Sequence, residues 1–549
     1  MWQGLGCSLP IENLDHLGLI AAIIDELGLV ELGDSELGTH SLQQVSPGQV
    51  LKAMILNGLG FVSAPLYLFS EFFQGQPVEH LLGPGIRAEH LNDDRLGRVL
   101  DGLFTYGTTL FFLKAAMLAV ERFEVKTNQV HLDSTSFALD GEYESSSVDQ
   151  ERPGDEEPRA IAIRRGYSRD HRPELKQFLV NLICSQDGGV PLWFKVGNGN
   201  DTDSQQFAKL LKDFAGQWHL EALMVVDAAF YSESNLQQVG SLKWLTRVPQ
   251  TLSATQALIE ADITQLDEQD CELADYRLWE QRQSYGGIEQ RWILVESQQR
   301  RQRDEGWKAS VDKQEKVLQR QLKELCRQIF ACKPDAMEAL LRFQDALENH
   351  TLTQVTLVPV TAKRTPGRPK KRGGSTDELV QGDQLQTTLE RQPQFEQTHR
   401  QRRSRFILAT NVLDAQTYPA QRLLQEYKQQ QHVERGFRFL KDPLFFTSSV
   451  FVKKPQRVEA LALVMALTLL VYTLGQRQLR QQLALTNQTV LDQKQKPTGN
   501  PTLRWVLQKF QAIHLVTLNG TQQVSNLTDE RSKIVRLFGL PCCRHYLLN

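Results

Sequence analysis

Residues 130–139 read VHLDSTSFAL, a β-rich run that carries an aspartate, Asp133, in its middle. Two further β-rich runs follow, QFLVNLICS at 177–185 and VPLWFKV at 190–196. The residues QDGG at 186–189 separate them and form a hairpin turn signal. The three runs together predict three consecutive antiparallel strands.

The next stretch predicts alternating helices and strands. DTDS at 201–204 caps a helix over 205–214, and the apolar strand at 222–226 ends in Asp227. A short helix and a strand at 243–248 follow. Three antiparallel strands, then helix, strand, helix and strand, is the order of the ribonuclease-H-like fold. We therefore predict an α/β sheet whose active site lies at strand ends.

Beyond residue 250 the pattern is interrupted by a large mixed α+β insertion and then resumes. Within the insertion we predict strands at 275–280, 290–296 and 354–358 and helices at 298–329 and 335–347. The sheet resumes at 405–411, a helix spans about 418–441, and an apolar helix spans 458–474.

Five regions follow from this pattern. They are a helical N-terminal domain (1–125), the first part of the catalytic domain (126–250), the insertion (251–403), the second part of the catalytic domain (404–475) and a helical C-terminal region (476–549). The N-terminal domain either recognises DNA ends, binds another partner or simply packs. No chemistry is assigned to the C-terminal region.

Composition is that of a soluble globular protein, with 41% hydrophobic and 23% charged residues and a net charge of -3. The seven cysteines include no CxxC pair, which argues against a disulfide framework or zinc site and fits a reducing cytoplasm. No signal peptide is expected. The most apolar run, at 460–474, is short for a membrane span and is interpreted as a buried helix.

The stretch 427–441, YKQQQHVERGFRFLK, predicts a helix with an unusual polar stripe. Tyr427, Glu434 and Lys441 are seven residues apart and share one face with Arg438. This helix face is either an ordinary solvated surface or a site that binds a metal and a phosphate backbone.

Three carboxylates, Asp133, Asp227 and Glu434, occupy places that converge in a ribonuclease-H-like fold. Neighbouring carboxylates repel, and divalent cations such as Mg²⁺ offset that repulsion. Two such ions can clamp the attacking and leaving oxygens of a phosphodiester displacement. The alternatives are that Asp133 is a turn residue and that Asp227 caps a helix. His131 is interpreted as a packed strand residue.

Basic segments lie within and after the insertion. The run KRTPGRPKKR at 363–372 is either a solvated loop or a basic arm on DNA, since Gly-Arg-Pro in a basic run resembles an AT-hook core. A second cluster spans 400–405. The candidate DNA contacts here are Arg364, Arg368, Lys370, Lys371, Arg372, Arg402 and Arg403.

The spacing of Tyr427, position 430, Glu434 and Lys441 resembles the tyrosine-arginine-glutamate-lysine signature of bacterial insertion-sequence DDE transposases. The segments LDST at 132–135 and VVDA at 225–228 look like the two aspartate motifs of that family. GYSRDHRPELKQ at 166–177 is also similar to a segment of this group. The resemblance covers roughly 126–475, and it departs from the signature at Gln430, where the group has arginine.

The resemblance implies a DNA transposase that binds terminal inverted repeats, cleaves the ends and joins the 3′ hydroxyls to target DNA. It implies two Mg²⁺ ions per site, which Mn²⁺ can replace, and a homodimer on paired ends of double-stranded DNA in the bacterial cytoplasm. No membrane and no small-molecule cofactor are expected. By the same resemblance, Tyr427 and Lys441 contact the DNA backbone beside the cleaved end. Gln430 stands at a phosphate-contacting position, and either Arg438 or a basic residue of the insertion compensates for the missing arginine.

Two alternatives to a transposase remain open. The first is a nuclease of the same fold that cuts without strand transfer. The second is a catalytically inactive DNA-binding relic of a transposase. Retention of all three acids argues against the relic, whereas Gln430 favours it.

Overall fold

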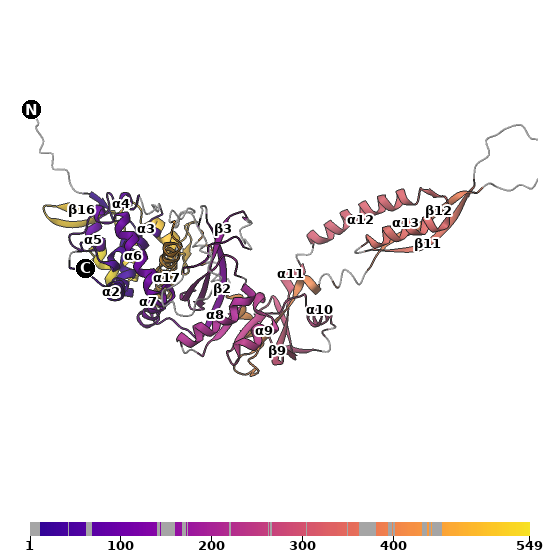
Figure 1. Cartoon of the computed structure of the whole chain (residues 1–549), viewed down its shortest axis with the longest axis horizontal. Coiled ribbons are helices and arrows are strands. Elements are labelled where there is room, and N and C mark those ends of the chain that lie inside the picture. Colours follow the sequence, from indigo (N-terminus) through magenta and orange to yellow (C-terminus); the bar gives the residue numbers. More distant parts are fainter. Residues whose placement is uncertain are drawn as a thin grey trace, which may run out of the picture. The chain divides into compact units, whose positions relative to one another are not determined.

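The computed structural model describes residues 11–548, apart from 42, 62–67, 140–142, 144–159, 167–171, 173, 202, 219–220, 262, 264–265, 303–304, 348–349, 362–379, 393–397, 399–400, 431–435, 437, 439–440 and 442–452. The described chain is a mixed α/β protein with a large mixed sheet (Figure 1). It divides into two compact units. The first comprises Met1–Arg247, Ser284–Gln290 and Thr410–Asn549, and the second comprises Val248–Gln283 and Arg291–Ala409.

Five strands of the first unit lie side by side in the order β4-β3-β2-β5-β6. Their bounds are β2 (Gln129–Leu139), β3 (Lys176–Ser185), β4 (Pro191–Gly197), β5 (Leu223–Val226) and β6 (Trp244–Arg247). β2, β3 and β4 are antiparallel, whereas β5 is parallel to both β2 and β6. Helix α8 (Asp203–Trp218) precedes β5 and α9 (Glu233–Val239) precedes β6, so the predicted succession of elements is confirmed.

The two faces of this sheet are covered by different helices. On β4, the Trp193 indole donates to Gln217 of α8 at 2.8 Å, and Lys195 pairs with Asp213 of α8 at 2.9 Å. Phe194 points the other way, and its ring lies 5.6 Å from that of Phe112 on α7 (Thr108–Phe123). Because side chains alternate along a strand, this fixes which residues of β2 and β3 face each layer.

Helices of the N-terminal region precede the sheet. They are α1 (Leu17–Leu27), α2 (Leu29–Leu37), α3 (Pro47–Gly58), α4 (Phe69–Phe72), α5 (Val78–Leu82) and α6 (Asp93–Tyr106). At the start of α3, Ser46 and Gln49 form a capping box, and Pro47 occupies the first turn.

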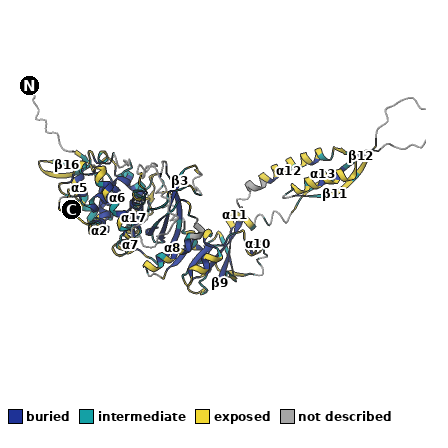
Figure 2. Cartoon of the chain, in the orientation of Figure 1, coloured by how far each residue is buried: buried dark blue, intermediate teal, exposed yellow. Residues whose placement is uncertain are grey.

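The apolar run at 460–474 lies within α17 (Pro455–Leu485), the helix about which the first unit packs. Among the described helices α17 is long and apolar enough to cross a membrane, but 83% of its most apolar window is buried inside the protein. The prediction of a buried helix is confirmed (Figure 2).

The C-terminal region packs against the N-terminal helices. Strand β16 (His514–Leu518) pairs with both β1 (Ile11–Asn13) and β17 (Thr521–Ser525), so the two ends of the described chain share a sheet (Figure 1). The remaining elements are β14 (Val490–Leu491), β15 (Pro497–Thr498), α18 (Leu503–Lys509), α19 (Asp529–Leu537) and α20 (Leu540–His545).

The second unit has strands in the order β13-β9-β8-β7 and a helix, α10. Their bounds are β7 (Asp267–Gln269), β8 (Tyr276–Tyr285), β9 (Ile288–Ser297), β13 (Arg405–Thr410) and α10 (Ser253–Glu260). Two ion pairs join neighbouring strands. Arg291 meets Glu280 through two bonds of 2.7 Å, and Arg405 meets Glu296 at 3.0 Å.

The same unit contains a smaller helix-and-hairpin layer. It consists of α11 (Gln298–Gln302), α12 (Glu305–Leu325), β10 (Ile329–Phe330), α13 (Lys333–Asp345), β11 (His350–Thr361) and β12 (Val380–Arg391). The strands run in the order β10-β12-β11, and Ala336, Leu340 and Leu385 form their core.

One prediction about the insertion is wrong, and one strand of the insertion was not predicted. The helix expected at 298–329 is two helices, and Ile329 and Phe330 are a strand because they pair with Gln384 and Asp383 of β12. Strand β12 was not predicted, because its sequence VQGDQLQTTLER shows little of the β-branched alternation that marks strands.

Candidate active site

Asp133 and Asp227 lie side by side on two parallel strands. The register of β2 with β5 pairs Leu132 with Val226, and the two aspartates are the next residue on each strand. Neighbouring strands are about 4.8 Å apart, and residues in register point to the same face. The two carboxylates therefore emerge close together on one face of the sheet, Asp133 from the middle of β2 and Asp227 from the end of β5.

Local hydrogen bonds hold each aspartate. Asp133 Oδ1 accepts the N–H of Ser134 at 2.7 Å, and Asp227 Oδ1 accepts the N–H of Ala228 at 2.5 Å. Asp227 also caps the short turn that begins at Ala228, so the capping role and the proposed site role coexist. The buried hydroxyl of Thr246 on β6 donates to the Asp227 carbonyl at 3.0 Å and fixes the backbone there.

The surroundings of Asp133 favour a cation. Burial and then the charge of Asp133 raise the pKa of the neighbouring Cys184 thiol, on β3. Asp133 and Asp227 are both half-buried, so their charges are only partly screened by solvent. Two adjacent carboxylates in such a place suit a hard divalent cation, which prefers oxygen ligands.

The third predicted acid, Glu434, lies outside the described residues. Within the described part of the chain, no group of three or more His, Cys, Asp or Glu residues is placed to hold a metal ion. The pair Asp133 and Asp227 is therefore the described portion of the predicted carboxylate set.

The face that carries Asp133 is the one opposite α8. Asp133 is paired with Leu182, which is in register with Phe194 on the α7 side. Further along β2, Lys441 Nζ lies 5.7 Å from the centre of the Phe137 ring, and Phe137 shares the face of Asp133. Lys441 therefore lies on the face of β2 that carries Asp133.

At the other end of the same face, α15 (Ala420–Lys428) contacts the start of β2. Gln129, which also shares the face of Asp133, lies near the buried Glu426 carboxyl. Burial raises the pKa of Glu426, and Arg422 and Gln129 offset part of that rise. Gln129, Arg422 and Gln429 line a polar cavity of about 320 Å³ beside it.

The prediction of a single helix over 418–441 is wrong. Helix α15 ends at Lys428, and the N–H groups of Gln429 and Gln430 turn back to Glu426 and Tyr427 at 3.1 and 3.2 Å. Such i→i+3 bonds tighten and end a helix. The prediction that Tyr427, Glu434 and Lys441 share one face assumed a continuous helix, so it does not apply.

The predicted DNA-contact residues within 427–441 differ in their exposure to solvent. Tyr427, Gln430 and Lys441 are half-buried, and Arg438 is exposed in a helical position. Gly436 is half-buried, and a Cβ there would approach Leu469 of α17 to 3.2 Å. Gly436 therefore lies close to α17.

The basic candidates of the insertion belong to the second unit. Arg402 is exposed and pairs with Glu260 at 2.6 Å, and Arg403 is exposed. Arg405, included in the same basic cluster by sequence, is buried and donates to Glu296 and to the Ile259 carbonyl. It is a structural residue rather than a DNA contact. Arg364, Arg368, Lys370, Lys371 and Arg372 lie outside the described residues.

The sequence analysis did not predict that Gly166 and Gln177, the two ends of the segment 166–177, both contact Gly199. A Cβ on Gly166 would lie 1.9 Å from the Gly199 carbonyl oxygen, so the two glycine backbones touch. The buried Gln177 side chain donates to the same carbonyl at 2.8 Å. The glycine-rich run GNGN at 197–200 was the available signal for this close approach.

Paired aspartates on adjacent parallel strands define this chain as an α/β protein with a candidate two-carboxylate site. The family model described as "Transposase DDE domain" matches residues 127–471, a range that contains Asp133, Asp227 and Glu434. The chain belongs to this family of DDE transposases, which generally use divalent metal ions. The resemblance noted in the sequence is confirmed.

Other comparisons add less. A domain of unknown function, DUF4277, matches residues 9–117. No curated protein matches the chain. Among solved structures, the chain is similar to the piggyBac transposase in a synaptic complex with hairpin DNA, determined by cryo-EM, at a TM-score of 0.36 and 8% identity. The alignment covers 90% of this chain and 79% of that chain, and a likeness this low carries no functional argument.

Proposed function

We propose that this transposase binds the terminal inverted repeats of its own element, cleaves the DNA ends and joins the 3′ hydroxyls to target DNA. The observation that carries the proposal is the register of β2 and β5, which supports Asp133 and Asp227 as neighbouring metal ligands. The strand order β4-β3-β2-β5-β6, with its mixture of antiparallel and parallel pairs, supports a ribonuclease-H-like core interrupted by an insertion.

Glu434 is proposed as the third metal ligand. The described residues on either side of it support this role, because Glu426 contacts Gln129 and Lys441 lies over Phe137. Gln129 and Phe137 flank Asp133 on one face of β2, four residues away in each direction. The chain from 426 to 441 therefore has its two ends at the two sides of Asp133.

The residues have separate tasks in the proposed reaction. Asp133, Asp227 and Glu434 hold two Mg²⁺ ions, or Mn²⁺ in their place, and Thr246 keeps Asp227 in position. When bound, the ions lower the pKa of the attacking hydroxyl and offset charge on the leaving oxygen. Lys441 and Tyr427 grip the DNA backbone beside the cleaved bond.

Further DNA contacts are proposed outside this site. Gln430 and Arg438 are candidates on the same segment, and the remainder are the basic residues Arg364, Arg368, Lys370, Lys371, Arg372, Arg402 and Arg403. Pairing two element ends implies a homodimer on double-stranded DNA, which fits a bacterial cytoplasmic protein bound to the nucleoid.

A labelled duplex taken from the DNA flanking the gene tests this function. The native chain is expected to cut it at the element boundary in Mg²⁺ and to join it to target DNA. Asp133→Asn and Glu434→Gln are expected to lower both rates about a thousandfold, because metal charge stabilisation contributes several kcal/mol and 1.36 kcal/mol is tenfold. EDTA should abolish both reactions.

Asp213→Asn is the matched control, because Asp213 lies on α8 and faces the opposite side of the sheet. It should cut and join at the native rate. Cutting without joining would identify a nuclease instead. Binding without metal-dependent cutting would identify an inactive relic.

A further inference from the structure

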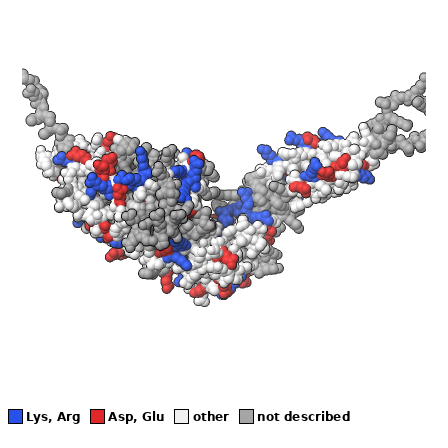
Figure 3. Space-filling model, in the orientation of Figure 1, with Lys and Arg blue, Asp and Glu red and all other residues white. Residues whose placement is uncertain are grey.

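The C-terminal region carries an excess of positive charge that the whole chain lacks. Residues 476–549 contain ten Lys and Arg against three Asp and Glu, whereas the chain contains 62 against 65. Figure 3 shows both signs of charge interspersed over the face that it draws. The excess of positive charge is therefore confined to residues 476–549, and it favours a partner with a negatively charged surface.

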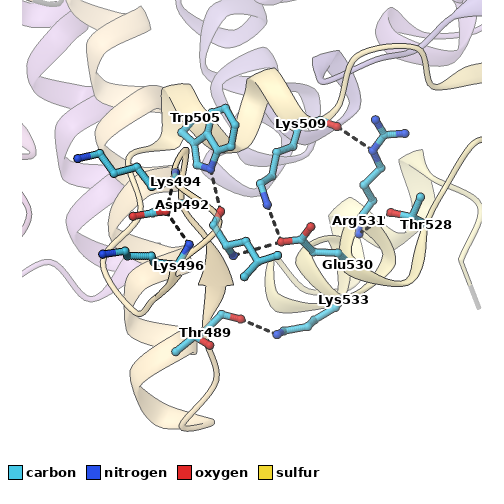
Figure 4. A network of polar contacts seen from close by, with 11 residues as sticks. Thr489, Asp492, Lys494, Lys496, Trp505, Lys509, Thr528, Glu530, Arg531 and Lys533 are labelled. Carbon is cyan, nitrogen blue, oxygen red and sulfur yellow. Dashed lines mark hydrogen bonds and ion pairs between the residues drawn. The ribbon is translucent and has the colours of Figure 1, made fainter.

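The three acids of this region are engaged near their own positions, and Figure 4 shows the contacts of two of them, Asp492 and Glu530. Asp492 Oδ1 accepts the backbone N–H groups of Lys494 and Lys496, each at 2.8 Å, and these bonds hold the pKa of Asp492 below its ordinary value. Glu530 pairs with Lys509 at 2.5 Å and also accepts the N–H of Leu491. Asp529 lies in the first turn of α19, where the helix dipole favours a carboxylate.

The elements that carry the cations are tied into one piece. The Trp505 indole of α18 donates to the Leu491 carbonyl at 2.8 Å, which fixes the β14–β15 hairpin to that helix. Lys533 of α19 donates to the Thr489 carbonyl at 2.6 Å, at the base of the same hairpin. The hairpin, α18 and α19 therefore present their side chains in a fixed arrangement (Figure 4).

Four cations of this module form what we call the C-terminal basic surface: Lys494, Lys496, Lys533 and Arg536. Lys494 and Lys496 are exposed on the hairpin turn, and Arg536 is exposed one helical turn beyond Lys533. Lysines on a short turn present point charges rather than the bidentate forks that read bases.

We propose that the C-terminal basic surface binds the phosphate backbone of duplex DNA, at a distance from the cleaved bond. Contacts of this kind release counterions and position a protein on the duplex without reading its sequence. The proposal rests on the proposed function, since a transposase must hold DNA on both sides of the bond that it cuts.

The length of helix α17 gives an approximate distance between the proposed active-site segment and the C-terminal basic surface. Leu469 lies against Gly436, in the segment that contains the proposed DNA contacts, and Leu485 ends the helix five residues before β14 begins. At about 1.5 Å per residue, the two leucines are about 24 Å apart along the helix axis. That span equals about seven base pairs of duplex at 3.4 Å each.

The test is binding of the full chain to a fluorescein-labelled 30-base-pair duplex of mixed sequence, measured by anisotropy at several salt concentrations. The variant Lys494→Gln/Lys496→Gln removes two charges while its backbone N–H groups can still bond Asp492. The slope of log K against log salt should become shallower by about 2, near 0.9 for each lost phosphate contact. Arg536→Gln, which leaves the Lys533 bond to Thr489 in place, should act in the same direction.

The matched control is Lys209→Gln/Lys212→Gln, which removes two exposed charges from α8. It should retain the native affinity and salt slope. An unchanged slope in the C-terminal variant, or an equal change in the control, would overturn the proposed surface. Cleavage of the element end by the native chain is scored separately, so a failure of the proposed function is distinguishable from a failure of this surface.

Discussion

At the scale of single residues, His16 shows how burial sets a pH limit on stability. Its Nε2 hydrogen bonds to the Leu59 carbonyl at 2.8 Å, and burial lowers the pKa of the ring from 6.5 to about 4. The unfolded chain binds a proton below pH 6.5 that the folded chain accepts only near pH 4. The free energy of unfolding should therefore fall by about 3 kcal/mol between those pH values.

His16→Gln tests this at one position. The amide can still donate to Leu59 but cannot titrate, so the part of the pH dependence due to His16 should disappear from the unfolding temperature measured between pH 6.5 and 4. The exposed His40→Gln serves as the control. An unchanged pH profile in His16→Gln would show that the buried ring is not the group responsible.

At the scale of elements, the hairpin layer of the second unit has a small core. Ala336, Leu340 and Leu385 are its buried centre, and many of its other residues are exposed (Figure 2). Leu385→Ala should cost about 3 kcal/mol and loosen α13, β11 and β12 first. Hydrogen exchange should rise there and stay native in α8. Leu341→Ala, at a 53% exposed position of α13, should change little, and uniform exchange throughout the chain would contradict a local core.

The same scale shows what the sequence could predict. Strands β2 to β6 follow from β-rich and apolar runs, and their order was enough to expect Asp133 and Asp227 side by side. The end of α15 could not be predicted, because glutamines at 429–431 are good helix formers and contain no stop signal. The burial of Glu426 against Gln129 is a tertiary contact that no local pattern reveals.

At the scale of the first unit, the last residues of the chain are part of the N-terminal core. Strand β16 pairs with β1, and α20 packs against α1. The buried Tyr546 hydroxyl donates to the Asp15 carbonyl at 2.5 Å, and its ring lies 5.5 Å from that of Phe510. A sequence divided into regions 1–125 and 476–549 gives no sign of this closure, because strand pairing between distant segments leaves no local pattern.

Tyr546→Ala tests whether the two ends fold together. Gly18 of α1 lies directly against this ring, since a Cβ there would be 2.8 Å from Tyr546 Cε2. Truncation should therefore leave a cavity that costs about 4 kcal/mol, and hydrogen exchange should rise in α1 and β1 as well as in α20. Leu540→Ala removes a 75% exposed side chain of α20 and should leave α1 protected. If Tyr546→Ala loosened α20 alone, the C-terminal region would be an appendage, and its basic surface would not be held rigidly to the helices of the first unit.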